Sequence, residues 1–172
     1  EGKLQKKYLA LAEGDLSEAN DSVFWKEIAI PLAPDPENSM KMTISPDGLL
    51  PGSRNAVTYY KNIKNFGNVT LVELQLETGR THQIRVHMAG IGHPLLGDTM
   101  YNPRACLKMS NRKEKKNTEG RINNRNDCFK RAALHAWKLT FCHPFTDEII
   151  TLEAPLPDDF CRFLNANEEE KT

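Results

Sequence analysis

Residues 56–91 decide the fold, and they read AVTYYKNIKNFGNVTLVELQLETGRTHQIRVHMAGI. In Ala56–Asn62 and in Val69–Glu77, apolar and polar side chains alternate at period two, the pattern of strands with one buried face. Gly67 and Asn68 lie between the two segments and are typical of a tight turn. The sequence therefore predicts two paired strands that form a hairpin.

The period changes in the second part of this stretch. Ile84, Met88 and Ile91 recur at i, i+4 and i+7, which places them on one stripe of an α-helix. The glycines and the proline just beyond them end the pattern. We expect an amphipathic helix of about three turns within residues 81–91. Its first turn would offer free backbone N–H groups and the positive end of the helix dipole to an anion.

Further strands are predicted on both sides of this stretch. They lie at Lys7–Ala12, Val23–Ile30, Met40–Ile44, Ala133–Phe141 and Ile149–Glu153. Pro31, Pro34 and Pro36 are expected to stop regular structure after the second of these strands. Since the first strand has almost nothing before it, we expect the native chain to start further upstream.

A short helix is expected near the C-terminal end of the chain. It would begin near Leu156 or Asp158, with Phe160, Phe163 and Leu164 facing the core. Many strands and only two helices indicate an α+β fold built on a mostly antiparallel, mixed sheet with few helices.

Composition is that of an ordinary globular chain. Of its 172 residues, 39% are hydrophobic and 27% are charged, so residues 1–172 are expected to form a single domain. No run of apolar residues approaches the length of a membrane span, and we expect a soluble, cytoplasmic monomer with no membrane partner. The formal net charge is zero, so charge alone does not indicate a nucleic-acid partner.

The charge is unevenly distributed along the chain. Residues 104–131 contain ten Lys or Arg against three acidic residues, a local charge of +7 that the rest of the chain balances. Within them, residues 104–126 have few large apolar side chains and are expected to be a basic, flexible insertion. Such a segment is either a solvated loop or an arm that binds phosphate groups, and the sequence leaves both open. Lys113, Lys115 and Lys116 are the candidate phosphate contacts.

The densest group of unusual residues is residues 78–87, TGRTHQIRVH, where a strand turns into the predicted helix. Arg80 adds a charge beside the first turn of that helix. Arg85 lies four residues after Thr81 and three after His82, so these three share a helix face. Residue types alone are compatible with an anion site or with a capped structural helix that carries surface charges.

A metal site has little support in the sequence. His82 and His87 are separated by roughly 140° around a helix, whereas zinc-binding pairs lie at i, i+4 with a Glu between them. The four cysteines form no C-x-x-C pair. No metal is therefore expected, and a metal-dependent hydrolase that uses His82, His87 and His93 is a disfavoured alternative. Acyl-transfer and P-loop motifs do not occur either.

Residues 78–101, TGRTHQIRVHMAGIGHPLLGDTMY, resemble the signature of the RluA-type family of rRNA and tRNA pseudouridine synthases. Other segments match the pattern of that family in the same order: KKYLALAEG at 6–14, IPL at 30–32, AVTYY at 56–60, RAALHAWKLTFCHPFT at 131–146 and APLPDDF at 154–160. The resemblance covers nearly the whole chain apart from the basic insertion. It implies the C-terminal portion of a pseudouridine synthase catalytic domain.

The resemblance also implies a reaction, the isomerisation of uridine to pseudouridine in RNA. Members of the family flip the target uridine out of its stack, because a stacked base hides its glycosidic bond. An aspartate drives cleavage of that bond, the uracil rotates, and C5 joins C1′. The aspartate belongs to an H-R-L-D segment that residues 1–172 lack, so we expect a truncated chain that is inactive alone. A redox-neutral isomerisation needs no cofactor.

Two residues take catalytic roles by resemblance. Tyr8 matches the active-site tyrosine, which would stack on the flipped uracil and help to remove the C5 proton. Arg85 would pair with the catalytic aspartate, because a guanidinium can grip a carboxylate with two bonds. Without that aspartate, Arg85 is expected to have no partner.

Other residues are expected to contact RNA or to support these two. The RNA-binding set comprises Arg80, Thr81, His82, Gln83 and Ile84, together with Lys113, Lys115 and Lys116 of the insertion. Ile84 is weighed mainly as a core residue that could lie near the base. His93, Pro94, Gly97 and Asp98 resemble a structural turn, and Asp98 is the one nearby carboxylate that could substitute for the nucleophile. The main alternative function is an RNA-binding module that keeps the fold without chemistry.

Overall fold

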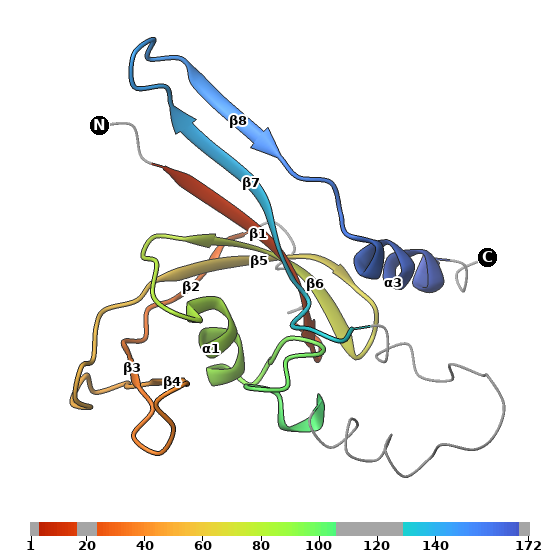
Figure 1. Ribbon diagram of the computed structural model, residues 1–172. Helices are drawn as coiled ribbons and strands as arrows, with labels where there is room; N and C mark the ends of the chain where they lie inside the picture. The colour runs from red at the N-terminus through yellow and green to blue at the C-terminus, as the bar shows by residue number, and fades with distance from the viewer. Residues whose placement is uncertain (1–3, 17–23, 106–128, 169–172) are drawn as a thin grey trace, which may run out of the picture.

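The computed structural model describes residues 4–16, 24–105 and 129–168, which form a six-stranded sheet with helices on its faces (Figure 1). The strands are β1 (Gln5–Glu13), β2 (Lys26–Ile28), β5 (Thr58–Asn65), β6 (Val69–Leu76), β7 (Leu134–Cys142) and β8 (Ile149–Glu153). They lie in the order β2-β5-β6-β1-β7-β8, and every neighbouring pair is antiparallel. The remaining elements are the two-stranded sheet of β3 (Leu32–Pro34) and β4 (Met42–Ile44), and the helices α1 (Gln83–Gly90) and α3 (Asp158–Glu168). The predicted α+β class is confirmed.

The hairpin predicted from the opening stretch is β5–β6. Its strands pair in antiparallel register, with Tyr59 opposite Gln75, and a bulge follows Asn62. Gly67 has a φ of 80°, a conformation that glycine adopts without strain. The turn residues and the period-two alternation therefore correctly located this pair of strands.

Strand β1 lies in the middle of the sheet, between β6 and β7. Its side chains alternate between two hydrophobic clusters, because successive residues of a strand point to opposite faces. Ala10 and Ala12 belong to the cluster under α1, whereas Leu9 and Leu11 belong to the cluster under α3. Burial on both faces explains why this strand is an almost continuous apolar run rather than an alternating one.

Helix α1 packs its apolar stripe on one face of the sheet. Ile84 and Met88 are buried against Val72 and Leu74 of β6. On the other side of α1, Val86 packs with residues of the small β3–β4 sheet. The helix is thus enclosed between the large sheet and the small one, as Figure 1 shows.

Helix α1 is shorter than predicted. It spans eight residues, about two turns, and the expectation of three turns is wrong. His82 precedes it with a φ of 56°, a left-handed conformation that cannot continue a right-handed helix. At the other end, Ile91 lies just outside the helix but still packs against the α1 cluster.

The expectation that prolines stop regular structure after Ile30 is also wrong. Leu32–Pro34 forms β3, which pairs with β4 so that Pro34 lies opposite Met42. Proline has no N–H group to donate, so within sheets it occurs mainly in edge strands. Both strands of a two-stranded sheet are edge strands. The second predicted strand is in turn shorter than expected, since β2 covers only Lys26–Ile28.

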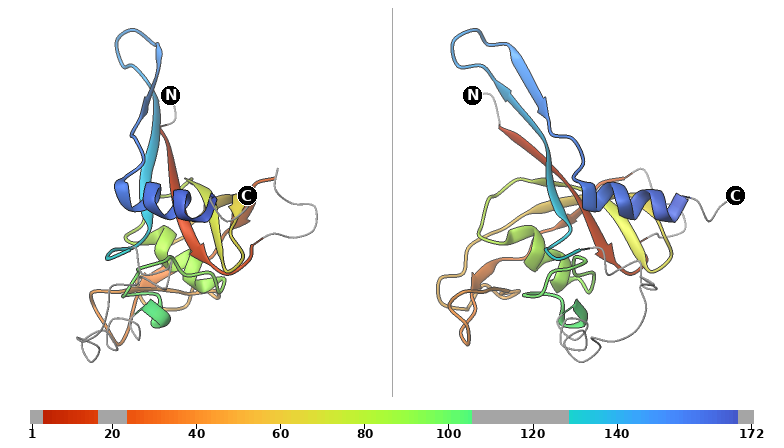
Figure 2. Two further views of the ribbon diagram at one scale, coloured as in Figure 1. Left: turned by 90° about the vertical axis from the view of Figure 1, so that its right-hand side faces the viewer. Right: turned by 45° about the vertical axis from the view of Figure 1, so that its right-hand side comes forward.

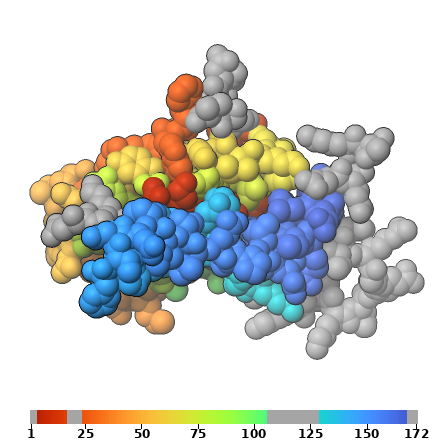
Figure 3. All heavy atoms as spheres, turned by 90° about the horizontal axis from the view of Figure 1, so that it is seen from above, coloured from red at the N-terminus to blue at the C-terminus, as the bar shows by residue number. Residues whose placement is uncertain are grey.

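Helix α3 covers the opposite face of the sheet. Phe160 and Phe163 are buried in the cluster with Leu9 and Leu11, and Leu164 packs against it. This confirms the predicted C-terminal helix and its apolar face. Figure 2 shows that the β7–β8 hairpin projects beyond the rest of the sheet, and in Figure 3 this hairpin and α3 form one continuous band.

The basic insertion predicted at residues 104–126 lies almost wholly outside the described residues, and so do Lys113, Lys115 and Lys116. None of the helices within the described ranges is both long and apolar enough to span a bilayer.

Candidate active site

Tyr8 lies on β1 beside an irregularity in its pairing with β7. Lys7 is opposite Lys138, but Tyr8 is opposite Ala136, so Trp137 has no counterpart on β1. A bulge of this kind twists the strand and changes the direction of side chains, and bulges are common beside active sites. The Tyr8 ring packs against the α1 cluster and is therefore on the α1 face of the sheet.

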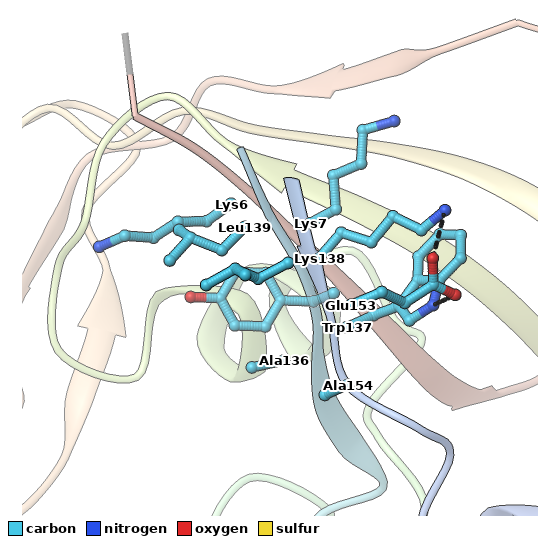
Figure 4. A pocket seen from close by; sticks show the side chains of 10 residues that line it. Lys6, Lys7, Ala136, Trp137, Lys138, Leu139, Glu153 and Ala154 are labelled. Carbon is cyan, nitrogen blue, oxygen red and sulfur yellow. Dashed lines mark hydrogen bonds and ion pairs between the residues drawn. The ribbon is translucent and has the colours of Figure 1, made fainter. Parts of the chain in front are cut away.

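A cleft of about 300 Å³ opens beside Tyr8 over strands β1, β7 and β8 (Figure 4). Its walls include Lys6, Tyr8, Ala136, Leu139, Leu152 and Ala154. This volume is at the lower end of the range for small-molecule sites. Apolar walls beside a phenol ring suit a flat heterocycle that stacks on the ring.

The Tyr8 phenol is held in its neutral form. Burial raises the pKa of Tyr8 above its ordinary value of 10.0. Within the described residues, its hydroxyl makes no hydrogen bond. A neutral phenol can pass on or donate a proton, but it becomes a base only when another group accepts its own proton.

Trp137, Lys138 and Glu153 also line the cleft (Figure 4), and Trp137 packs against the cluster under α3 as well. The Lys138 Nζ atom lies 4.0 Å from the centroid of the Trp137 ring. Both side chains donate to Glu153, Lys138 at 3.0 Å and Trp137 Nε1 at 2.9 Å. These hydrogen bonds lower the pKa of Glu153, so its carboxylate stays ionised and bound to both side chains.

Arg85 has a partner, contrary to expectation. Its Nε and Nη2 atoms donate to the two carboxylate oxygens of Asp98, each at 2.7 Å. The hydrogen bonds to Asp98 raise the pKa of Arg85 above its ordinary value. The expectation failed because a buried carboxylate lies in the segment after α1, and a buried carboxylate must be paired.

Asp98 is a poor candidate for a substitute nucleophile. Its side chain is fully buried. Beyond the two bonds from Arg85, its Oδ1 atom accepts the backbone N–H groups of Met100 at 3.1 Å and Tyr101 at 3.2 Å.

The predicted structural turn is present: Gly97 has a φ of 68°, and a Cβ atom there would overlap the Arg131 carbonyl oxygen.

His82 is half-buried at the start of α1. Its Nδ1 atom lies 2.8 Å from the Tyr101 hydroxyl. Burial, and then the charge of Arg85, lower the pKa of His82, so its ring is neutral near pH 7. Tyr101 was not foreseen as part of this site.

The buried side chain of Gln83 stabilises the start of α1 through hydrogen bonds. It is buried, its Oε1 atom accepts from Thr78 Oγ1 and Arg80 N–H, each at 2.9 Å, and its Nε2 atom donates to the Val57 carbonyl at 2.9 Å. Its amide is therefore out of reach of an RNA phosphate. Ile84 is a core residue.

Arg80 and Thr81 lie nearer the surface. Arg80 is half-buried and donates through Nε to the Asn55 carbonyl at 3.1 Å, and Thr81 is exposed.

The three histidines do not gather around a common point. His87 is buried, with Nδ1 2.8 Å from Thr58 Oγ1 and Nε2 2.8 Å from the Ile30 carbonyl oxygen. His93 Nδ1 lies 2.9 Å from the Glu13 carbonyl oxygen. In the part of the chain that the structure describes, no three His, Cys, Asp or Glu side chains are grouped to hold a metal ion.

The structure places Tyr8 and Arg85 on the same face of the sheet without joining them. Ile84, the neighbour of Arg85, is in the cluster against which Tyr8 packs. No hydrogen bond or ring contact links Tyr8 to Arg85 within the described residues. Sequence reasoning missed Asp98 as the partner of Arg85. The available signal was that Asp98 is the sole acidic residue in residues 78–101.

Comparisons with known proteins identify the family of the chain. The chain is 40% identical over 164 residues to ribosomal large subunit pseudouridine synthase D of Haemophilus influenzae, covering 95% of this chain and 45% of that protein. It is 38% identical over 159 residues to the uncharacterized RNA pseudouridine synthase YlyB of Bacillus subtilis, covering 92% and 43%. The solved structure of human RNA pseudouridylate synthase domain containing 1 superposes with a TM-score of 0.62 at 26% identity, covering 90% of this chain and 55% of that one.

The chain thus spans less than half the length of these two bacterial relatives. A family model described as RNA pseudouridylate synthase matches residues 1–90, just over half of the chain. The match includes Tyr8 on β1 and all of α1 with Arg85. The chain belongs to the RNA pseudouridylate synthase family, whose RluA-type members its motifs resemble.

Proposed function

We propose that this chain supplies the uridine-binding part of an RNA-modifying enzyme that isomerises uridine to pseudouridine. The observation that carries the proposal is the apolar cleft beside Tyr8, whose size and phenol ring suit a single flipped base. A duplex or stacked base could not enter such a cleft. The enzyme would therefore have to flip its target out of the RNA first.

The isomerisation breaks the bond between N1 and C1′ and forms a bond between C5 and C1′. The uracil rotates between the two steps, C5 loses a proton, and N1 gains one. Tyr8 would stack on the uracil throughout and would pass on the C5 proton through its neutral hydroxyl. Because atoms and electrons balance within the substrate, the reaction calls for no metal or organic cofactor.

The carboxylate that initiates the reaction would come from outside the described residues. Asp98 is saturated with donors, and Glu153 is engaged by Lys138 and Trp137. We infer that an upstream segment supplies an aspartate and that Arg85 binds it. The substrate would be RNA in the cytoplasm, and the name of the H. influenzae relative favours large-subunit rRNA over tRNA.

The test uses RNA that carries tritium at C5 of uridine. We would compare the 172-residue chain with a form extended upstream to the length of its relatives, here called the extended protein. The extended protein should release tritium into water, and the 172-residue chain alone should not. Turnover by the short chain would show that its own residues supply the nucleophile. An extended protein that binds RNA without releasing tritium would support the binding-module alternative.

A further inference from the structure

Residues outside helix α1 hold the guanidinium group of Arg85 in place. One edge of the guanidinium is bound by Asp98, with two bonds of 2.7 Å. One face is covered by the Tyr101 ring, whose centroid is 4.9 Å from the Arg85 Cζ atom. The guanidinium is thus fixed from two directions, by a carboxylate in its plane and by an aromatic ring above it.

Asp98 is itself held rigidly. Its side chain is fully buried, and its Oδ1 atom accepts the N–H groups of Met100 and Tyr101 in addition to the bond from Arg85. Its carbonyl oxygen accepts the N–H group of Asn102 at 2.8 Å. A carboxylate with this many donors has one orientation, so the guanidinium that it grips with two bonds is oriented too.

Tyr101 is anchored at its hydroxyl. That oxygen lies 2.9 Å from the backbone nitrogen of Met42 on β4 and 2.8 Å from His82 Nδ1. The oxygen accepts the Met42 N–H, and the tautomer of the imidazole decides which partner is the donor in the bond with His82. The two bonds hold the ring between β4 and the start of α1. The surface against which Arg85 lies is therefore fixed as well.

The second edge of the guanidinium is not used within the described part of the chain. Asp98 takes Nε and Nη2, and Nη1 of Arg85 has no partner there. The Arg85 side chain is 20% exposed, so it can be approached from outside. A planar guanidinium presents donors on both edges and can bind a second carboxylate at the free one.

We propose that Asp98 and Tyr101 are positioning residues that hold Arg85 so that its Nη1 edge receives the carboxylate that initiates the isomerisation. The inference rests on the proposed function and assigns these two residues within it. Displacing a reacting group by about 1 Å can cost on the order of 100-fold in rate. An arginine that is fixed from two sides would prevent such a displacement of the incoming aspartate.

Asp98 would also act through its charge. Its negative charge offsets that of Arg85, which limits how far the guanidinium lowers the pKa of a carboxylate at the other edge. Asp98→Asn would leave Arg85 with its full charge facing the catalytic aspartate. The acidic limb of the pH–rate profile should then move to lower pH. An ion pair that only stabilises the fold would not move this limb.

The experiment measures single-turnover tritium release and RNA affinity in the extended protein, well below the melting temperature of each variant. Asp98→Asn should lower the rate on the order of 100-fold and shift the acidic limb, with RNA affinity nearly unchanged. Asp159→Asn is the matched control, because Asp159 also pairs with an arginine, Arg131, at 2.9 Å. The control should leave the rate and the pH profile as they are.

Two substitutions at Tyr101 test the proposal independently, in case Asp98→Asn does not fold. Tyr101→Phe keeps the ring over Arg85, whereas Tyr101→Leu removes it, so the rate should fall in the order wild type, Phe, Leu. Rates equal to the wild type in folded Asp98→Asn and in Tyr101→Leu would overturn the proposal. A wild-type extended protein that binds RNA without turnover would instead overturn the proposed function, and this inference with it.

Discussion

At the scale of single residues, Tyr8 combines two properties that one substitution can separate. Its ring forms a wall of the cleft, and burial raises the pKa of its hydroxyl, which further favours the neutral phenol. Tyr8→Phe keeps the ring and removes the hydroxyl. In the extended protein, single-turnover tritium release should fall on the order of 100-fold with little change in RNA affinity. An unchanged rate would reduce Tyr8 to a stacking surface.

Arg85 and Asp98 should depend on each other for stability as well. Arg85→Ala would leave the buried Asp98 carboxylate without its main partner, which typically costs about 3–5 kcal/mol of the free energy of unfolding. Removing both side chains should cost less than the sum of the two single changes. Urea denaturation of the four proteins of this double-mutant cycle measures the difference. Additive losses would contradict a coupled pair.

The residues of the site differ in how far sequence could predict them. Tyr8 and Arg85 stand within motifs, so their positions followed from resemblance. Gln83 stands in the same motif, yet its amide points into the protein. There it forms hydrogen bonds with Thr78 and with the backbone of Val57 and Arg80. The direction of a side chain at a helix start depends on tertiary partners, which residue type and spacing do not encode.

At the scale of elements, α1 is attached to the sheet through a buried, neutral histidine. Burial lowers the pKa of His87, outweighing the opposing effect of its bond to the Ile30 carbonyl. The unfolded chain takes up a proton near the ordinary value of 6.5, while the folded chain resists it. The stability that this histidine contributes is therefore complete above that pH and is lost as the pH falls below it.

This loss can be measured by urea denaturation from about pH 7.5 to about pH 5. The free energy of unfolding should fall by up to about 1.4 kcal/mol per pH unit for each such histidine. His82, whose pKa is also lowered, contributes in the same direction. His87→Gln should flatten the profile. An equally steep profile in His87→Gln would refute the assignment.

Elements that are determined by the residues of one short stretch could be predicted from the sequence. Elements that depend on tertiary contacts could be predicted less well. The β5–β6 hairpin followed from its turn and its alternation, because both lie within a short stretch of sequence. Strand β3 was missed because Pro34 and the prolines on either side of it argue against a strand, and only the pairing with β4 forms one there. The start of α1 was misplaced because His82 adopts a left-handed conformation that its residue type does not reveal.

At the scale of the whole molecule, the sheet order depends on contacts that the sequence pattern does not show. β1 lies between β6 and β7, although some 55 and 120 residues separate it from them along the chain. The apolar run at Lys7–Ala12 predicted a strand but not which strands lie beside it. The arrangement matters for function, because the cleft is formed where β1 meets β7 and β8.

Positive charge is concentrated in one segment of the chain. The chain is neutral overall, yet residues 104–131 carry +7. Arg104, at one end of this segment, lies 3.3 Å from Glu13, and Arg131, at the other, lies 2.9 Å from Asp159. Both ends are thus tied to the folded part of the chain by ion pairs. From this charge we predict that the segment contacts RNA phosphates.

Replacing Lys113, Lys115 and Lys116 with Ala should therefore weaken RNA binding almost equally for all sequences. Each lost phosphate contact should reduce the slope of log affinity against log salt by about one. Tritium release from bound RNA should survive, because these lysines take no part in the chemistry. A control that removes three lysines elsewhere, Lys26, Lys41 and Lys64, should change the slope less. If the slope is unaltered in the first variant, the segment is a solvated loop, and the phosphate contacts must come from Arg80 and the start of α1.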